Sequence, residues 1–227
     1  MDRVRGTGQI VLVEAGQVTF LRAFRSCLGC LVLVIAAGQD MRAGEFNPVL
    51  DIGDQAPVWK DLPGVDGKQH SLVDLKTADV VVVVFTCNTC PYAVDYEQRL
   101  VEFDRLYRDQ NVRLVAINVN RIEDDLLPAM KQRARERKFR FPYLHDESQQ
   151  IARDYGAGYT PEFFVLNRDR KVVYMGSMDD NADAAKVKIR YVQLAVEAAR
   201  ANRLPEKTET VAVGCRVRFE RRRRKPR

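Results

Sequence analysis

The apolar positions of the chain change their spacing at one point near its middle. Five consecutive valines at 80–84 form a short, β-branched run, which predicts a strand that is buried on both faces. Beyond Cys90 the large apolar side chains recur at steps of four, three and four residues, at Tyr96, Leu100, Phe103 and Tyr107. This spacing predicts a helix with one buried face. Residues 112–119 form another apolar run, so the order strand, helix, strand predicts a parallel pair with a right-handed crossover.

Turn residues and apolar spacing predict further elements on both sides of this unit. Before the valine run we expect a turn at 66–68 and a short turn or helix at 71–75. After residue 119 we expect a surface helix at 123–138 with Pro128 in its first turn, and then an extended piece at 141–144. A short helix at 148–155, stopped by Gly156 and Gly158, and a hairpin of strands 163–166 and 171–174 are expected to follow. A last helix is expected from Asp180 or Asn181 to about Arg203, burying Ala184, Val187, Tyr191, Leu194 and Ala198. The order predicts an α/β protein with a central mixed β-sheet flanked by helices, and it resembles the thioredoxin arrangement.

Two cysteines, Cys87 and Cys90, lie where the valine strand ends and the next helix begins. A helix N-terminus favours negative charge, and the reactive form of cysteine is the thiolate. A spacing of three residues brings both sulfurs to one face of a first helical turn. We therefore expect a redox dithiol, with Cys87 near the exposed helix tip as the attacking thiol and Cys90 as the resolving thiol. The alternative is half of a zinc site, which would need a second ligand pair such as Cys27 and Cys30.

A second part of the expected site is the dipeptide Thr160-Pro161, which precedes the strand at 163–166. In a thioredoxin-like fold this position is a cis-proline that packs against the dithiol, whereas taken alone the dipeptide would be an ordinary trans entry to a strand. A proline here removes a hydrogen-bond donor near the sulfurs, and the backbone of Thr160 could pair with a substrate peptide. Thr86 and Pro91, which flank the two cysteines, complete the expected substrate-binding residues.

Two further residues are accessory candidates. Glu162 is the acid nearest to Pro161 in the sequence, and it could transfer a proton to the resolving thiol, although a solvated glutamate at a strand edge is the simpler interpretation. Cys215 lies in the alternating segment 211–219, which predicts a strand with Cys215 on its apolar face. The alternative for Cys215 is a third thiol that exchanges with the dithiol.

The two ends of the chain differ from its middle. Residues 1–43 are interpreted as a leader that contains a secretory signal, because the apolar run 27–37 follows Arg22 and Arg25 and ends in small residues. The run is shorter than a membrane span, which needs about 20 apolar residues, and a buried N-terminal helix is the alternative. We assign 48–204 to the folded domain and 205–227 to a C-terminal strand and basic tail.

The net charge of +6 in this chain of 227 residues comes entirely from that tail. From Arg218 onward there are seven basic residues and one acid, so the rest of the chain is neutral. A block of this kind is typical of a solvated end. No aromatic residues alternate with the basic ones after Arg221, and we expect no nucleic-acid partner.

Several blocks of the sequence together resemble the redoxins of the AhpC/TSA type in the thioredoxin superfamily, and more narrowly their peroxiredoxin-like branch. The blocks lie at 53–57, 66–68, 85–91, 141–147, 160–164, 174–180 and 213–215. The resemblance covers about 48–219 and implies a thioredoxin fold with an N-terminal redoxin extension. In two places the chain departs from these relatives. It has Tyr159 where they often carry a third cysteine, and Thr89 where they often carry a histidine that would stabilise the thiolate.

The sequence favours disulfide exchange over peroxide reduction. True peroxiredoxins resemble P-x-x-x-T/S-x-x-C, and counting back from Cys87 the matching positions are Val84 and Val80, which have no hydroxyl to orient a peroxide. We therefore expect an antioxidant thiol–disulfide oxidoreductase that acts on protein thiols and disulfides, exported to the bacterial periplasm or another extracytoplasmic site. Neither a cofactor nor a metal is expected. The alternatives are a thiol-dependent peroxidase, with peroxide as substrate, and a non-catalytic redoxin-fold binding module.

Overall fold

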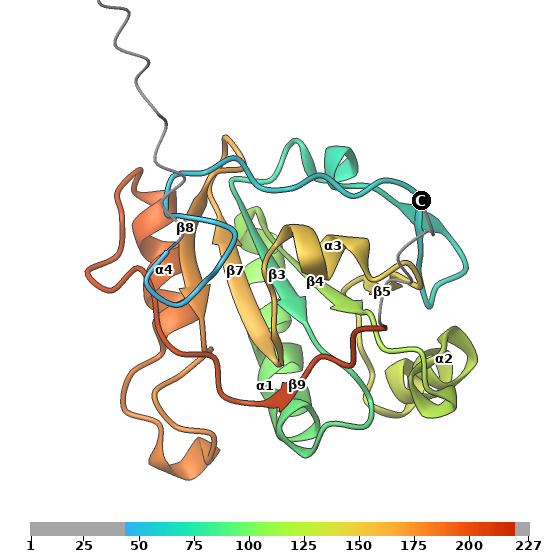
Figure 1. Cartoon of the computed structure of the whole chain (residues 1–227). Helices are drawn as coiled ribbons and strands as arrows, with labels where there is room; N and C mark the ends of the chain where they lie inside the picture. The colour runs from blue at the N-terminus through green and yellow to red at the C-terminus, as the bar shows by residue number, and fades with distance from the viewer. Residues whose placement is uncertain (1–43, 221–227) are drawn as a thin grey trace, which may run out of the picture. The chain divides into compact units, whose positions relative to one another are not determined.

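The structure is a computed structural model that describes residues 44–220 (Figure 1). Its centre is a five-stranded sheet in the order β5-β4-β3-β7-β8. The strands are β3 (Val80–Phe85), β4 (Val112–Asn118), β5 (Tyr143–His145), β7 (Glu162–Leu166) and β8 (Val172–Gly176). β3, β4 and β5 are parallel to one another, whereas β7 and β8 form an antiparallel hairpin beside β3. The predicted mixed sheet, parallel pair and hairpin are therefore confirmed.

The valine strand occupies the middle of this sheet. Every residue of β3 is buried, because neighbouring strands cover both of its edges and helices or loops cover both of its faces. Val80, Val82 and Val84 belong to the hydrophobic core on one face, and Val81, Val83 and Phe85 belong to the core on the other face. β-branched residues suit such a doubly buried strand. Its carboxyl end leads directly to the two cysteines.

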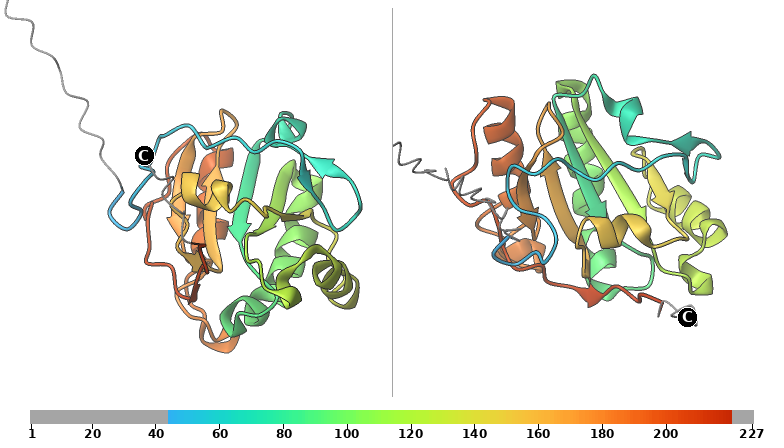
Figure 2. Two further views of the ribbon diagram at one scale, coloured as in Figure 1. Left: turned by 45° about the vertical axis from the view of Figure 1, so that its right-hand side comes forward. Right: turned by 45° about the horizontal axis from the view of Figure 1, so that its top comes forward.

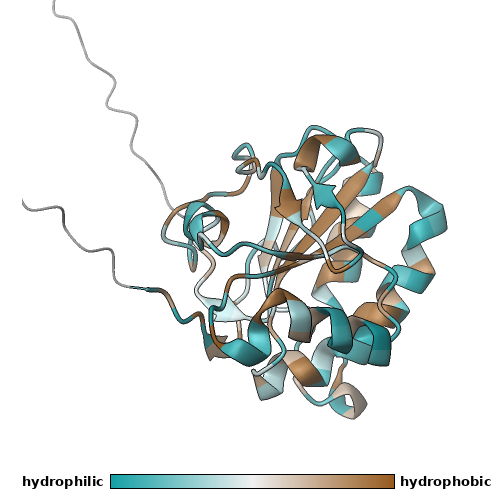
Figure 3. Ribbon diagram, turned by 90° about the vertical axis from the view of Figure 1, so that its right-hand side faces the viewer, coloured by the Kyte–Doolittle hydropathy of each residue, from teal (hydrophilic) through white to brown (hydrophobic). Residues whose placement is uncertain are grey.

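Within residues 44–220 four α-helices pack around the sheet. Figure 2 gives two further views of this arrangement. The helices are α1 (Pro91–Tyr107), α2 (Leu127–Glu136), α3 (Gln150–Asp154) and α4 (Tyr191–Arg200). α1, α2 and α4 contribute to the core on one face of the sheet, and α1 does so through the predicted stripe Tyr96, Leu100, Phe103 and Tyr107. α3 contributes to the core on the other face through Ile151 and Ala152. Figure 3 shows hydrophobic residues concentrated on the strands and hydrophilic residues along the helices.

The segment that precedes β3 covers the same face as α3. Trp59 and Leu72 are buried there with Val81 and Phe164. The predicted turn at 66–68 joins β1 (Leu62–Pro63) to β2 (Gln69–His70), and Gly67 has a φ of +80°, a conformation that glycine adopts readily. The expected short helix follows as the 3₁₀ turn η1 (Leu72–Leu75). This segment is the N-terminal extension that the redoxin resemblance implied.

The predicted surface helix at 123–138 is divided in two. A 3₁₀ turn, η3 (Glu123–Asp125), is followed by α2, and Leu126 between them is extended with a ψ of 162°. Pro128 lies in the first turn of α2 as expected, and Met130 and Ala134 are buried as expected. The break matters for the site because it turns Asp125 inward, where it is fully buried.

The predicted last helix was wrong in its start and in most of its expected buried residues, although Ala198 is buried as predicted. Asp180 does not cap a helix: its Oδ1 accepts the backbone N–H groups of Lys188 and Ile189, which closes a loop that contains the 3₁₀ turn η4 (Ala184–Lys186). α4 therefore begins only at Tyr191. It buries Val192, Ala195, Val196, Ala198 and Ala199, whereas Leu194 is 56% exposed.

The predicted strand at 211–219 is much shorter than expected. Thr208 and Thr210 first hydrogen-bond the backbone of Met175 in β8, beside the start of β7, and the chain then runs along that end of the sheet. There β9 (Cys215–Arg216) pairs antiparallel with β6 (Tyr159–Thr160). Figure 1 shows this C-terminal segment in red, passing beside α1. Val213 is exposed, so the alternation in the sequence did not predict burial correctly.

The predicted leader 1–43, with the apolar run 27–37, lies outside the described residues, and so does the basic run 221–227. Within residues 44–220 no helix is both long enough and apolar enough to cross a membrane.

Candidate active site

Both cysteines of the dithiol lie between β3 and α1. Proline is favoured at a first helical position, and Pro91 begins α1, so Cys90 is the residue that caps this helix. Asn88 and Thr89 form a bend, which places Cys87 three residues before the cap and outside the first turn. Cys87 is 4% exposed and Cys90 is 2% exposed. The expectation that Cys87 occupies an exposed helix tip was therefore wrong.

The loop between the two cysteines is held by the carboxylate of Asp125. Its Oδ1 accepts the backbone N–H of Asn88 at 2.6 Å, and its Oδ2 accepts the hydroxyl of Thr89 at 2.7 Å. The side-chain amide of Asn120 donates to Oδ2 at 2.9 Å, and that of Asn118 donates to the Asp125 carbonyl at 3.1 Å. A buried carboxylate is tolerated when several donors satisfy it, as they do here. This network fixes the backbone that separates the two sulfurs.

The side chain of Asn88 strengthens the same network. Its Nδ2 donates to the carbonyl of Asp124 at 2.8 Å, and its Oδ1 accepts the hydroxyl of Tyr143 at 3.0 Å. Sequence reasoning missed this role of Asp125, which is one of three consecutive acids at 123–125. The buried loop between the two cysteines needs a hydrogen-bond acceptor for its backbone N–H groups. The sequence does not indicate which of the three acids provides that acceptor.

The predicted cis peptide bond between Thr160 and Pro161 is present. The backbone carbonyl of Thr160 accepts the Cys90 thiol at 3.0 Å, and the Thr160 hydroxyl lies 3.5 Å from Cys87 Sγ. One residue from a distant part of the chain therefore contacts both sulfurs. The structure brings together the two parts of the site that the sequence predicted separately.

Cys215 completes a cluster of three sulfurs. It is half-buried and packs against Cys87, Cys90 and Ala93. Its position follows from β9, which places Cys215 directly opposite Thr160. Position 159 is a tyrosine in this chain, but a third sulfur reaches the site from another segment.

Glu162 is buried and not solvated, which corrects the simpler interpretation of this residue. It is 7% exposed, and its Oε2 accepts the backbone N–H groups of Gly158 and Tyr159 at 2.8 and 3.0 Å. Burial raises the pKa of Glu162 to about 7, although the two backbone hydrogen bonds oppose the shift. Glu162 therefore holds the turn that leads into β6, and it titrates near neutral pH.

The sulfurs of the dithiol differ in their acidity. The hydrogen bond with Cys90, then desolvation and the charge of Asp125, raise the pKa of Cys87. The hydrogen bond with Cys87 lowers the pKa of Cys90 despite its burial, and the thiol of Cys215 and the backbone N–H of Ala93 contribute further. The hydrogen bond between the two sulfurs thus lowers the pKa of Cys90, at the N-terminus of α1, and raises that of Cys87.

The other two predicted substrate-binding residues occupy different environments. Thr86 is buried, and its backbone N–H donates to the carbonyl of Ile117 at 3.0 Å, so it continues the pairing of β3 with β4. Pro91 is exposed at the start of α1, next to Tyr92, which is 42% exposed. Within the described residues, Thr89, Pro91 and Tyr92 are the exposed positions next to the dithiol in sequence.

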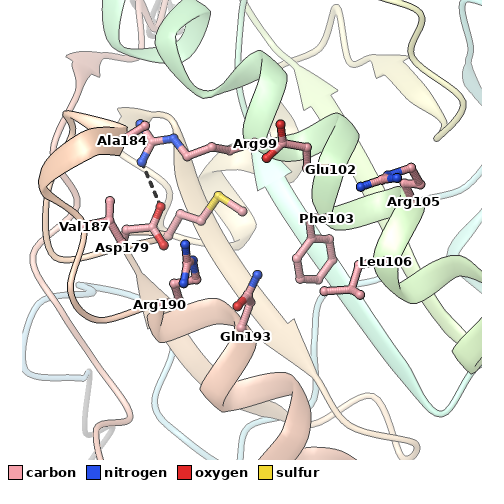
Figure 4. A pocket seen from close by; sticks show the side chains of 11 residues that line it. Arg99, Glu102, Phe103, Arg105, Leu106, Asp179, Ala184, Val187, Arg190 and Gln193 are labelled. Carbon is pink, nitrogen blue, oxygen red and sulfur yellow. Dashed lines mark hydrogen bonds and ion pairs between the residues drawn. The ribbon is translucent and has the colours of Figure 1, made fainter.

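A cavity of about 470 Å³ lies apart from the sulfurs, between α1, α4 and the loop that joins β8 to α4 (Figure 4). None of the cysteines that the structure describes lines it. Arg99 points from α1 toward Asp179, and the two form an ion pair at 2.8 Å. Among residues 44–220 no group of three His, Cys, Asp or Glu side chains is arranged to hold a metal ion, and Cys27 and Cys30 lie outside that range.

Comparison with known proteins now identifies the family. The Redoxin family model matches residues 51–190, which is more than half of the chain. The chain belongs to the Redoxin family. A curated relative, the thiol-disulfide oxidoreductase ResA of Bacillus thuringiensis, is 29% identical over 147 residues, which cover 63% of this chain and 80% of the relative.

Two solved structures support the same conclusion. An uncharacterised conserved protein of Geobacillus kaustophilus is 34% identical with a TM-score of 0.71, and the match covers 77% of this chain and 95% of that one. A putative thioredoxin of Neisseria meningitidis is 18% identical with a TM-score of 0.53, and the match covers 66% of this chain and 93% of that one. The second likeness concerns the fold alone. The predicted thioredoxin fold and redoxin family are confirmed, and the curated relatives are oxidoreductases, as expected of this chain.

Proposed function

We propose that this redoxin is a thiol–disulfide oxidoreductase that exchanges disulfides with protein partners through Cys87 and Cys90. The observation that carries the proposal is the contact of both sulfurs with Thr160: its carbonyl accepts the Cys90 thiol, and its hydroxyl lies beside Cys87 Sγ. Relatives named thiol-disulfide oxidoreductase support the same reaction class.

The reaction transfers two electrons in two exchange steps. A thiolate of the enzyme attacks a substrate disulfide, which forms a mixed disulfide and releases one substrate thiolate. The other enzyme thiol then attacks the enzyme sulfur of the mixed disulfide, releases the second substrate thiolate and leaves a disulfide between Cys87 and Cys90. The sequence favoured Cys87 as the attacking thiol. Cys87 is also slightly more exposed than Cys90, at 4% against 2%, whereas the lowered pKa of Cys90 favours that residue, so the trapping experiment below assigns the two roles.

The edge formed by Thr160 and Pro161 is the proposed docking site for the substrate. Its backbone lies against the sulfurs, and a peptide added there as a further strand would bring its own disulfide to them. Pro91 and Tyr92 supply the exposed rim of this site. The buried Thr86, just beyond the end of β3, supports the dithiol loop and does not form part of this exposed rim.

Peroxide reduction is the less favoured reaction. Val80 and Val84, which occupy the positions of the peroxide-orienting residues of peroxiredoxins when counted from Cys87, are fully buried in the sheet and carry no hydroxyl. Export to an extracytoplasmic compartment, which rests on the apolar run 27–37, remains part of the proposal. Fractionation of the native host, with the 27–37 run deleted as a control, tests that part.

Trapping of mixed disulfides tests the function and assigns the two thiols. Cys87→Ser and Cys90→Ser variants are expressed in the native host, and proteins linked to them are released with reductant and identified. The variant that keeps the attacking thiol should accumulate partners, and the other variant should not. Wild-type protein should reduce insulin in the presence of dithiothreitol, and both variants should lose this activity. Peroxide consumption without insulin reduction would contradict the proposal.

A further inference from the structure

The C-terminal segment occupies the edge that we propose for the substrate. β9 pairs antiparallel with β6, so that Tyr159 lies opposite Arg216 and Thr160 lies opposite Cys215. The backbone N–H of Val217 donates to the carbonyl of Gly158 at 2.9 Å. The segment therefore binds as an added strand, which is how a peptide would dock beside the cis-proline.

Cys215 points to the same side of this strand pair as Thr160. Residues that face each other in an antiparallel pair carry their side chains on one side of the ladder. The Thr160 hydroxyl lies 3.5 Å from Cys87 Sγ, so this is the side of the dithiol. The contact of Cys215 with Cys87, Cys90 and Ala93 agrees with that orientation. Burial, and then the hydrogen bond with Cys90, raise the pKa of Cys215. Cys215 is therefore protonated at neutral pH and lies beside the more acidic Cys90.

Gly214 allows this close approach. A Cβ atom at position 214 would lie 2.1 Å from the carbonyl oxygen of Thr160, which is the atom that accepts the Cys90 thiol. Any larger residue would push the segment away from the cis-proline edge. The Gly-Cys pair is therefore shaped to place a sulfur at the dithiol.

Contacts on both sides of β9 keep the segment in register. Thr208 and Thr210 are bonded to the backbone of Met175. On the far side, the buried side chain of Gln149 donates to the carbonyl of Arg218 at 2.9 Å and accepts the N–H of Glu220 at 2.8 Å. These polar contacts belong to ordered segments of the domain, so Cys215 is held in place and does not depend on the two residues of β9 alone.

We propose that the C-terminal segment 208–220 is a built-in substrate and that Cys215 is a third redox thiol, which exchanges disulfides with Cys90. The inference rests on the proposed function. After a substrate has been reduced, the disulfide joins Cys87 and Cys90. The thiolate of Cys215 attacks Cys90 Sγ, a bond forms between Cys90 and Cys215, and Cys87 leaves as a thiolate that takes up the proton lost by Cys215. The exchange consumes no further oxidant.

This exchange has a consequence for the order of events at the site. A disulfide between Cys90 and Cys215 ties the segment over the cis-proline edge, and a protein partner can dock only after that disulfide has been reduced and the segment displaced. The oxidised enzyme is thereby protected from a second, unwanted exchange with a partner.

Disulfide mapping in a Cys87→Ser variant tests the proposal directly. The variant is oxidised with glutathione disulfide, digested and analysed by mass spectrometry. The expected main product is an intramolecular disulfide between Cys90 and Cys215, with release of two glutathione molecules. The matched control carries Cys87→Ser, Cys215→Ser and Arg216→Cys, which moves the thiol to the opposite side of β9. It should give glutathione adducts and little intramolecular disulfide.

The result of disulfide mapping is independent of the experiments that test the proposed function. Equal amounts of glutathione adduct in the Cys87→Ser protein and its control would overturn the inference, while trapping by single variants and insulin reduction would still decide the function. Conversely, a disulfide between Cys90 and Cys215 in a protein without insulin reductase activity would support the sulfur contact and contradict the proposed function.

A second variant keeps the test independent of cysteine replacement. Gly214→Ala should lift the segment from Thr160 and increase the alkylation rate of the Cys90 thiol several-fold, whereas Val213→Ala, at an exposed neighbouring position, should leave it unchanged. Circular dichroism and thermal unfolding confirm that both proteins are folded. Equal alkylation rates in both variants and the wild type would overturn the inference.

Discussion

Asp125 Oδ1 accepts the backbone N–H of Asn88 at 2.6 Å, which joins the 3₁₀ turn after β4 to the loop between the two cysteines. The carboxylate is fully buried and also binds Thr89 and Asn120. Replacing it with alanine leaves these donors without an acceptor, and we expect Asp125→Ala to lower the free energy of unfolding by about 3 kcal/mol. Urea unfolding measures this loss. Asp124→Ala, at the exposed neighbouring position, should cost far less.

Asp125→Asn should separate the electrostatic role of this residue from its packing role. The amide still offers one oxygen to the loop, but the negative charge that helps to raise the pKa of Cys87 is gone. The pKa of Cys87 should therefore fall, which is measurable as an alkylation rate against pH in a Cys90→Ser background. A titration of Cys87 that is identical with and without the charge would contradict this account of its acidity.

Stability should depend on pH through Glu162. Its pKa is about 7 in the folded protein against 4.5 for an ordinary glutamate, so between these values the folded state holds a proton that the unfolded state has released. The free energy of unfolding should therefore fall as pH rises from about 4.5 to 7, by roughly 3 kcal/mol in total. Glu162→Gln has no such proton to lose, and its stability should vary less over this range.

The matched control for that experiment is Glu162→Ala. Glutamine keeps an oxygen that can accept the N–H groups of Gly158 and Tyr159, whereas alanine removes it. We expect glutamine to retain insulin reductase activity at neutral pH and alanine to lose part of it, because the turn before Thr160 is no longer held. Identical pH profiles of stability for wild type and the glutamine variant would rule out the proposed titration.

Thr160→Val should make both sulfurs less acidic. The threonine hydroxyl lowers the pKa of Cys87 and of Cys90, although for each sulfur the other cysteine has the larger influence. Valine has the same shape without the hydroxyl, so the backbone contacts at the cis-proline edge should persist. The alkylation profile of the dithiol should move to higher pH. Thr89→Val, whose hydroxyl donates mainly to Asp125, should move it less.

Arg99 should contribute to the stability of the fold and not to the reactivity of the cysteines. Its guanidinium pairs with Asp179 at 2.8 Å and stacks on Tyr96, and desolvation already raises the pKa of the Asp179 carboxyl. Arg99→Ala leaves that carboxyl buried and unpaired, so we expect a loss of about 3 kcal/mol in the free energy of unfolding. Cysteine alkylation in the folded protein should be unchanged. Arg105→Ala, exposed on the same helix, serves as the control.

The sequence predicted those parts of the fold that depend on a local apolar period. The valine strand, the stripe on α1 and the hairpin of β7 and β8 were all found in this way, and the cis-proline followed from the resemblance to thioredoxin. The start of α4 was missed because the carboxylate of Asp180 bonds two amides eight and nine residues ahead, a loop contact that leaves no period in the sequence.

The parts of the site that sequence reasoning missed come from distant segments. Asp125 reaches the dithiol loop from 37 residues away, and nothing distinguishes it from Glu123 and Asp124 before the break after η3 is known. Cys215 was considered as a third thiol, but its alternating neighbours favoured a longer strand. The strand pairing with Thr160 decides its position, and such pairing across 55 residues cannot be read from local spacing.

The close fit of Gly214 on Thr160 has a practical consequence for anyone who assays this protein. The segment 208–220 lies over the reactive sulfurs and is followed directly by the basic run 221–227. A purification tag or fluorescent fusion attached after this run is therefore connected to the segment that covers the site. Turnover recorded with such a fusion reports on the attachment as well as on the enzyme. Assays of the untagged chain avoid this complication.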